Sequence, residues 1–238
     1  MRFLAAAALI CLFSSSAAAE WSISAYLGGT RTQNSYLAFR NETNGDNLRF
    51  EDVDWESRDF DGPLYYGIRS GHFFRYFGIE TEFNHLKVFA RTDRSYQTSG
   101  EIGSTTLGGH RRLDDFVQQF GMSHGVNLLM LNSVVRVRLW REEDERLGRI
   151  IIAGRVGGGR TFPHPEARAF GQEWSEYDVG SGVFHLAGGA EVKIGGPLFL
   201  LGEYKHTRMT QEVHVGPRAF AKTPLRTHHF VTGLALHF

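Results

Sequence analysis

The stretch LMLNSVVRVRL, residues 129–139, alternates between apolar and polar side chains, and this alternation decides the fold. Its apolar face lies on the odd positions, which are Leu129, Leu131, Val135, Val137 and Leu139. Asn132, Arg136 and Arg138 fall on the even positions. Successive side chains of a β-strand point to opposite faces, so the pattern predicts a strand with one apolar face and one charged face.

The same alternation recurs along the chain in segments of about ten residues, which is typical of strands that cross a membrane. We predict eight strands, near residues 21–32, 55–73, 77–91, 116–140, 148–162, 174–194, 198–213 and 226–238. Short connections alternate with long polar ones, which include 30–54, 91–115, 163–174 and 214–226. This arrangement predicts an all-β, eight-stranded antiparallel up-and-down transmembrane β-barrel. A secreted soluble sandwich is the alternative, but its solvent face would not need charges of both signs at similar depth.

Composition agrees with a sheet protein and excludes one class of partner. The 238 residues include 26 Lys and Arg against 26 Asp and Glu, so there is no net charge and no nucleic-acid partner is expected. The 28 Gly, the 13% aromatic residues and only 6 Pro suit strands joined by tight turns. The length fits one barrel domain.

Residues 1–19 match a secretory signal peptide, which leaves residues 20–238 as the outer-membrane β-barrel domain. A short positive start precedes the apolar stretch 3–13, and the segment ends in small residues of the A-x-A type. Cys11 is the only cysteine, so the mature chain has no disulfide and no Cys ligand. The C-terminal Phe238 resembles the assembly signal of outer-membrane barrels. We therefore expect the bacterial outer membrane as the location, its bilayer as the surroundings, and the barrel-assembly machinery as a partner during insertion.

The charged faces of the strands are expected to fill the barrel lumen, because an eight-stranded barrel has no aqueous pore. The inward charges would be Glu80, Glu82, Arg136, Arg155, Glu191, Lys193, Glu203 and Lys205. Leaving one of them unpaired would cost about 3–5 kcal/mol, so we predict a paired network. Within it, Glu191 or Lys193 should approach Glu203 or Lys205.

Histidines and carboxylates converge on the loop end of the predicted barrel. His85 ends the third strand, His124 begins the fourth, and His164 and Glu166 follow the fifth. Imidazole and carboxylate are ligands that suit Fe, Mn or Zn. We predict that His124, His164 and Glu166 meet at the extracellular mouth and hold a divalent metal ion, with iron favoured. His85 would lie nearby and Asn127 would be a hydrogen-bonding neighbour. The alternative for each histidine is a surface or packing role.

Strand alternation limits this hypothesis at two positions. Ser123 and His124 are adjacent, so their side chains should point to opposite faces and should not form a nucleophile–base pair. His85 shares the face of Phe83, which is directed toward lipid, unless a bulge near the rim changes its direction.

Five short motifs in this order resemble the lipid A oxidase-like outer-membrane barrels. They are PLYYGIR (63–69), FNHLKVFA (83–90), SHGVNLLMLN (123–132), PHPE (163–166) and GEYK (202–205). The S/T-H-G-x-N block is the most distinctive of them, and the resemblance extends over most of residues 21–238. The charged segment 141–149 departs from the family pattern.

The resemblance implies an enzyme that oxidises the proximal glucosamine of lipid A to 2-aminogluconate, with O₂ as co-substrate and lipopolysaccharide as partner. O₂ does not oxidise a sugar readily without a metal or an organic cofactor, because the reaction is spin-forbidden. The second hypothesis is a non-enzymatic barrel of the OmpA, OmpX or OmpW kind, which serves envelope integrity, adhesion or lipid binding. The first predicts a compact cluster of His85, His124, His164 and Glu166, and the second predicts that these side chains are scattered.

Overall fold

Eight long antiparallel strands close into a barrel in a computed structural model that describes residues 20–140 and 148–238. In ring order they are β1 (Glu20–Thr32), β5 (Tyr66–Phe74), β6 (Phe77–Ala90), β9 (Val117–Leu139), β10 (Ile150–Pro163), β13 (Gly182–Gly195), β14 (Leu198–Gly216) and β15 (Ala219–His237). The ring closes because β1 pairs with β15. The predicted eight-stranded barrel is therefore confirmed. The predicted signal peptide lies outside the described residues.

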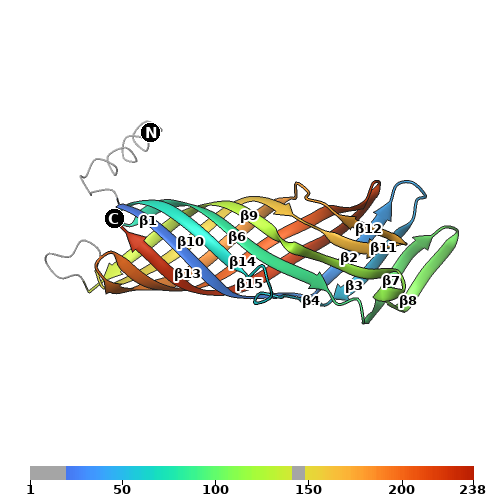
Figure 1. Cartoon of the computed structure of the whole chain (residues 1–238), viewed down its shortest axis with the longest axis horizontal. Coiled ribbons are helices and arrows are strands. Elements are labelled where there is room, and N and C mark those ends of the chain that lie inside the picture. The colour runs from blue at the N-terminus through green and yellow to red at the C-terminus, as the bar shows by residue number, and fades with distance from the viewer. Residues whose placement is uncertain (1–19, 141–147) are drawn as a thin grey trace, which may run out of the picture.

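The shorter elements all belong to the loop end of the barrel, opposite the two ends of the described chain (Figure 1). They are β2 (Ser35–Asn41), β3 (Asn47–Val53), β4 (Trp55–Glu56), β7 (Ser95–Ile102), β8 (Thr105–Arg112), the 3₁₀ turn η1 (Leu113–Asp115), β11 (Glu166–Ala169) and β12 (Gln172–Ser175). Strands β2, β3, β7 and β8 extend the sheet outward from β15. Within the described residues, no helix is long and apolar enough to cross a membrane.

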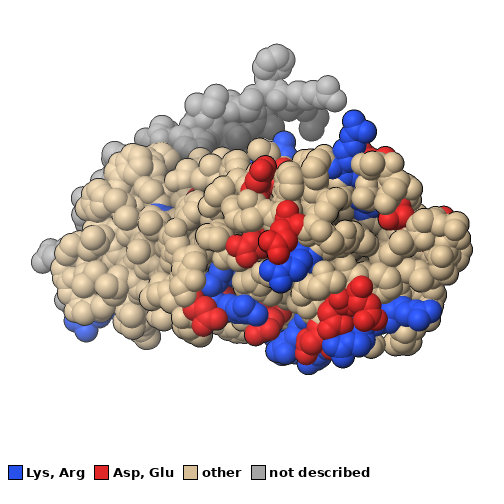
Figure 2. All heavy atoms as spheres, turned by 45° about the vertical axis from the view of Figure 1, so that its right-hand side comes forward, with Lys and Arg blue, Asp and Glu red and all other residues tan. Residues whose placement is uncertain are grey.

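The outer wall of the ring is apolar toward the termini and charged toward the loops (Figure 2). Exposed apolar side chains come from every strand of the ring, among them Ile23, Ile68, Ile79, Leu131, Ile152, Leu186, Leu200 and Leu234. Water would not favour so large an exposed apolar surface, whereas the hydrocarbon of a bilayer does. The chain is therefore a transmembrane β-barrel of the outer-membrane type.

The structure corrects four of the predicted strand boundaries. The second long strand begins at Tyr66 rather than at residue 55, and the sixth begins at Gly182 rather than at residue 174. The predicted long loop at 214–226 is wrong, because β14 continues to Gly216 and β15 begins at Ala219. This hairpin keeps its alternation above the membrane, where buried Val213 and Leu225 pack into the core.

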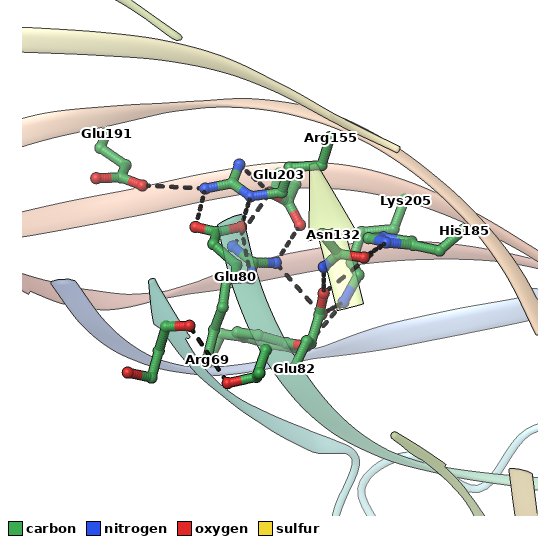
Figure 3. Close-up of polar contacts among 12 residues, drawn as sticks. Arg69, Glu80, Glu82, Asn132, Arg155, His185, Glu191, Glu203 and Lys205 are labelled. Carbon is green, nitrogen blue, oxygen red and sulfur yellow. Dashed lines mark hydrogen bonds and ion pairs between the residues drawn. The ribbon is translucent and has the colours of Figure 1, made fainter. Parts of the chain in front are cut away.

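A network of ion pairs fills the interior of the membrane-spanning part (Figure 3). Arg155 binds Glu80 and Glu203, each through a contact of 2.7 Å, and reaches Glu191 at 3.5 Å. Seven of the eight predicted inward charges are buried, and Lys193 is half-buried. Glu191 and Glu203 are joined by Arg155, which contacts both carboxylates. Glu191 does not contact Lys205 directly. The strand register explains this, because Glu191 lies opposite Leu201.

The interior of the loop end is apolar. Phe39, Phe50, Trp55, Phe120 and Met122 are buried there in one core cluster. Phe39 packs on Phe120 with ring centroids 5.7 Å apart, and Trp55 packs on Phe120 at 6.2 Å. These side chains come from β2, β3, β4 and β9, so the loop strands close the barrel over its lumen. Some polar side chains are buried among them and bond to one another, as Gln211 Nε2 does when it donates to Thr161 Oγ1 at 3.0 Å.

Candidate functional site on the outer wall

His124, His164 and Glu166 meet above the apolar band. One ligand atom of each residue lies within 4.8 Å of the other two. The two imidazole rings are 4.6 Å apart and nearly perpendicular, and His124 Nδ1 lies 3.1 Å from a carboxylate oxygen of Glu166. The structure thus brings together all three residues that the sequence predicted as metal ligands. Their role remains a prediction.

The cluster lies on the outside of the barrel rather than within its mouth. Thr161 and Pro163 are buried, while Phe162 between them is exposed, so the even positions of this segment face outward. Glu166 and Arg168 continue this outward face, since Ala167 and Ala169 beside them are buried in the core. His164 is buried itself, but it packs between the rings of exposed His124 and exposed Tyr177. Apolar side chains such as Phe39 and Phe120 fill most of the interior at this height, which leaves the outer wall for the cluster.

A local irregularity in β9 sets the direction of His124. Gly125 adopts a φ of 97°, in the left-handed region that favours glycine, and the register of β6 against β9 shifts between Leu86 and Val88. As a result Ser123 Oγ lies 3.1 Å from His124 Nδ1, although alternation predicted that these side chains diverge. That expectation was wrong. Ser123 and Glu166 both approach Nδ1 of the same ring, so the three do not form a Ser–His–acid relay, which uses the two nitrogens separately.

His85 and Asn127 form a neighbouring pair on the same outer wall. His85 Nδ1 donates to Asn127 Oδ1 at 2.8 Å, and Asn127 Nδ2 donates to the carbonyl oxygen of Phe162 at 3.2 Å. The ring of His85 stacks on Tyr66 and shields its Nε2, which is buried without a hydrogen-bond partner. His85 lies outside the three-residue cluster. Asn127 is a hydrogen-bonding neighbour as predicted, although its bonds join His85 and β10 rather than the cluster itself.

Tyr177 and a pocket beside Glu166 complete the surroundings of the cluster, and sequence reasoning identified neither. Tyr177 packs edge-on against His164 with ring centroids 4.5 Å apart, while 67% of its own surface stays exposed. The pocket has a volume of about 280 Å³ and is lined by Gln119, Glu166, Ala167, Arg168, Glu173, Trp174 and Ser175. The sequence contained no signal for either, because Tyr177 and Trp174 lie in a loop and a short strand without a motif.

The donor set fits a divalent transition metal. Two imidazoles and a carboxylate with open positions are the ligands that non-haem iron sites use. His164 Nδ1 is buried and has no hydrogen-bond partner. Buried polar atoms normally have one, so this nitrogen is free to bind a ligand. Metal–ligand bonds of about 2.0–2.2 Å bring donor atoms closer together than 4.8 Å, so binding would require small side-chain rotations. His124 is exposed on the surface and can make such a rotation.

Comparison with known proteins finds likeness in structure only. No family model matches the chain, and no curated protein matches it. Neisserial surface protein A aligns with a TM-score of 0.41 and 6% identity, over 92% of this chain and 97% of that one. The outer membrane protease OmpT of Escherichia coli aligns with a TM-score of 0.41 and 12% identity, over 95% and 99%. Ail, the attachment invasion locus protein of Yersinia pestis, aligns with a TM-score of 0.34 and 10% identity, over 90% and 97%.

Proposed function

We propose that this barrel is an enzyme of the bacterial outer membrane that oxidises the proximal glucosamine of lipid A to 2-aminogluconate. The observation that carries the proposal is the cluster of His124, His164 and Glu166 on the outer wall, just above the apolar band. A head group in the outer leaflet reaches this position by lateral diffusion. A soluble substrate would gain nothing from a site that faces along the membrane surface.

The lining of the adjoining pocket suits a sugar. Gln119, Arg168 and Glu173 offer hydrogen bonds, and Trp174 offers an aromatic face. Arg168 Nε binds Glu173 at 2.7 Å, which fixes both polar groups at the pocket edge. Glu166 lines the pocket and belongs to the cluster, so a sugar in the pocket would present its ring to the candidate ligands.

The proposed reaction removes two electrons and two protons from the anomeric carbon and its hydroxyl group. O₂ accepts them and becomes hydrogen peroxide, while the sugar becomes a lactone that water opens to the 2-aminogluconate. The anomeric carbon must carry a free hydroxyl, because a phosphate at that oxygen would leave no proton to lose. A bound iron or similar ion would make the spin-forbidden reaction with O₂ accessible.

The residues of the chain have separate tasks in this reaction. His124, His164 and Glu166 would hold the ion. Tyr177 packs on His164 and restricts the rotation of its ring. Asn127 holds His85 and β10 together below the cluster, which keeps the segment carrying His164 in place.

Mass spectrometry of lipid A tests the proposal. The full chain is expressed in a bacterial strain whose lipid A has a free anomeric hydroxyl and contains no 2-aminogluconate. We expect a mass increase of one oxygen atom in cells grown with air and no increase without it. His164→Ala and Glu166→Gln should abolish the increase. His110→Ala and Glu101→Gln, on the exposed hairpin of β7 and β8, should retain it.

An unchanged lipid A in aerated cells that contain the folded barrel would contradict the proposal. In that case the non-enzymatic hypothesis of an OmpA- or OmpW-like barrel would account for the fold.

A further inference from the structure

A row of basic side chains lies on the outer wall formed by β14, β15 and β1, above the apolar band. Arg31 pairs in register with His228, and His228 pairs with His206. Arg208 pairs with Arg226 one step nearer the loops. The three arginines are exposed, and the contacts described for them include no ion pair. Asp59 lies near this row, but its carboxylate is occupied by Thr30, which donates to it through its backbone N–H and its hydroxyl.

The row borders a hollow of about 570 Å³. This hollow is lined by Arg31, Thr32, Gln33, Asn34, Tyr204, His228 and Phe230. His228 is fixed there by Gln33 Nε2 at 2.9 Å and by the Tyr204 hydroxyl at 2.5 Å. The neighbouring His206 Nδ1 is buried without a hydrogen-bond partner. The hollow therefore combines positive charge with hydrogen-bond donors, as an anion requires.

A second groove continues from this hollow along the same wall toward the membrane. It has a volume of about 480 Å³, and Tyr204 and Phe230 line both it and the hollow above. The groove is deepest at Gly202, because this residue has no side chain and its neighbours in register, Ala190 and Thr232, have small ones. The outward positions above and below, such as Leu200 and Phe230, are large. A chain of methylene groups fits such a groove.

We propose that this wall binds one membrane lipid with a phosphomonoester head group, with the phosphate in the hollow and an acyl chain in the groove. A phosphomonoester carries about −1.5 to −2 charges at pH 7 and accepts paired hydrogen bonds from a guanidinium. Charge complementarity selects the head group, and the shared lining of the two cavities joins it to the acyl chain. The site lies apart from the His124 cluster, because β13 stands between β10 and β14. The proposal does not depend on the proposed oxidation.

Native mass spectrometry of the full barrel in detergent tests the proposal with phosphatidic acid as the probe. We expect one phosphatidic acid to remain bound, with an affinity on the order of tenfold above that of phosphatidylglycerol, which is a phosphodiester. Equimolar inorganic phosphate should not displace it. The double variant Arg31→Ala/Arg226→Ala should lose at least about tenfold in affinity, since it removes two guanidinium groups that would bind the phosphate. Arg111→Ala on β8 should retain it.

The groove is tested by filling it. A Cβ at Gly202 meets no atom within 4 Å, so a side chain can be added there and Gly202→Leu places its branched end in the groove. The matched control is Gly154→Leu, because Gly154 is also outward-facing and also meets nothing within 4 Å. We expect Gly202→Leu to abolish retention of the lipid and Gly154→Leu to preserve it, with circular dichroism confirming both folds. Equal retention of phosphatidylglycerol, displacement by inorganic phosphate, or full retention in Gly202→Leu would overturn the proposal.

Discussion

His124 and His164 meet edge to face, with ring centroids 4.6 Å apart, because a bulge in β9 turns one of them toward the other. The backbone N–H of His164 donates to the carbonyl oxygen of Gly125 at 3.0 Å, which joins the two segments directly beneath the rings. Gly125 is thus both the irregular residue of β9 and the anchor of the segment that carries His164. The geometry of the cluster depends on this one glycine.

Replacing Gly125 with Ala should damage the candidate site. Its φ of 97° disfavours a side chain, and a Cβ would lie 2.3 Å from Cε1 of His85. We expect a loss of about 1–3 kcal/mol in the free energy of unfolding, measured with urea in lipid vesicles, and weaker binding of Co²⁺ in a spectroscopic titration. Gly154→Ala is the control, because its Cβ meets open space. Unchanged stability and unchanged Co²⁺ binding would show that the bulge does not shape the cluster.

Much of the fold follows from alternation, since each membrane-spanning strand must show one face to lipid and the other to the lumen. Strand ends above the membrane were harder to predict. Residues 214–226 look like a polar loop, yet they form the hairpin of β14 and β15 because the loop core buries Val213 and Leu225. Lipid no longer contacts the outer face there, so its polar residues carry no signal that separates strand from loop.

The membership of the cluster was predictable and its surroundings were not. Ordering residues by height along the barrel brought His124, His164 and Glu166 to one level. Simple parity then failed at Ser123, because the register of β9 against β6 slips by two residues between Met122 and Val126 and breaks the local alternation. The outer-wall position was also missed, since it depends on Phe39, Phe50 and other apolar side chains of the loops that fill the interior.

Removing Arg155 should destabilise the barrel strongly. Arg155 → Met leaves Glu80, Glu191 and Glu203 without a guanidinium that all three contact. We expect a loss of about 3–5 kcal/mol in the free energy of unfolding, because three buried carboxylates lose the cation that they share, while Arg69 stays beside Glu80 and Glu203 and His237 beside Glu191. Arg40→Met is the control, since Arg40 pairs with Glu212 at the exposed surface, where such pairs contribute about 0–1 kcal/mol. Equal losses for the two variants would contradict a paired lumen.

The missing side chain of Gly67 makes room for Tyr26 in the lumen. A Cβ at Gly67 would lie 2.0 Å from Cζ of Tyr26, whose hydroxyl group binds Glu82 and Lys205. Gly67→Ala should therefore cost about 1–3 kcal/mol in unfolding free energy through overpacking. Tyr26→Phe in the same background should not restore stability, because the ring itself causes the clash. Wild-type stability of Gly67→Ala would show that Tyr26 can shift without loss.

The loop that carries Asp178 should loosen in acid. Burial acts to raise the pKa of this carboxyl group, but the backbone N–H of His214 at 2.9 Å and its imidazole at 2.8 Å outweigh burial and hold the pKa below its ordinary value. A carboxyl group with a lowered pKa in the folded state stabilises that state at pH values above its unfolded pKa of about 3.9. This contribution is lost as the pH falls through the lower, folded value. The free energy of unfolding in urea should therefore be higher for the wild type than for Asp178→Asn at pH 6. This difference should be smaller at pH 3. An advantage that is equal at both pH values would mean that the charge on Asp178 does not stabilise the fold.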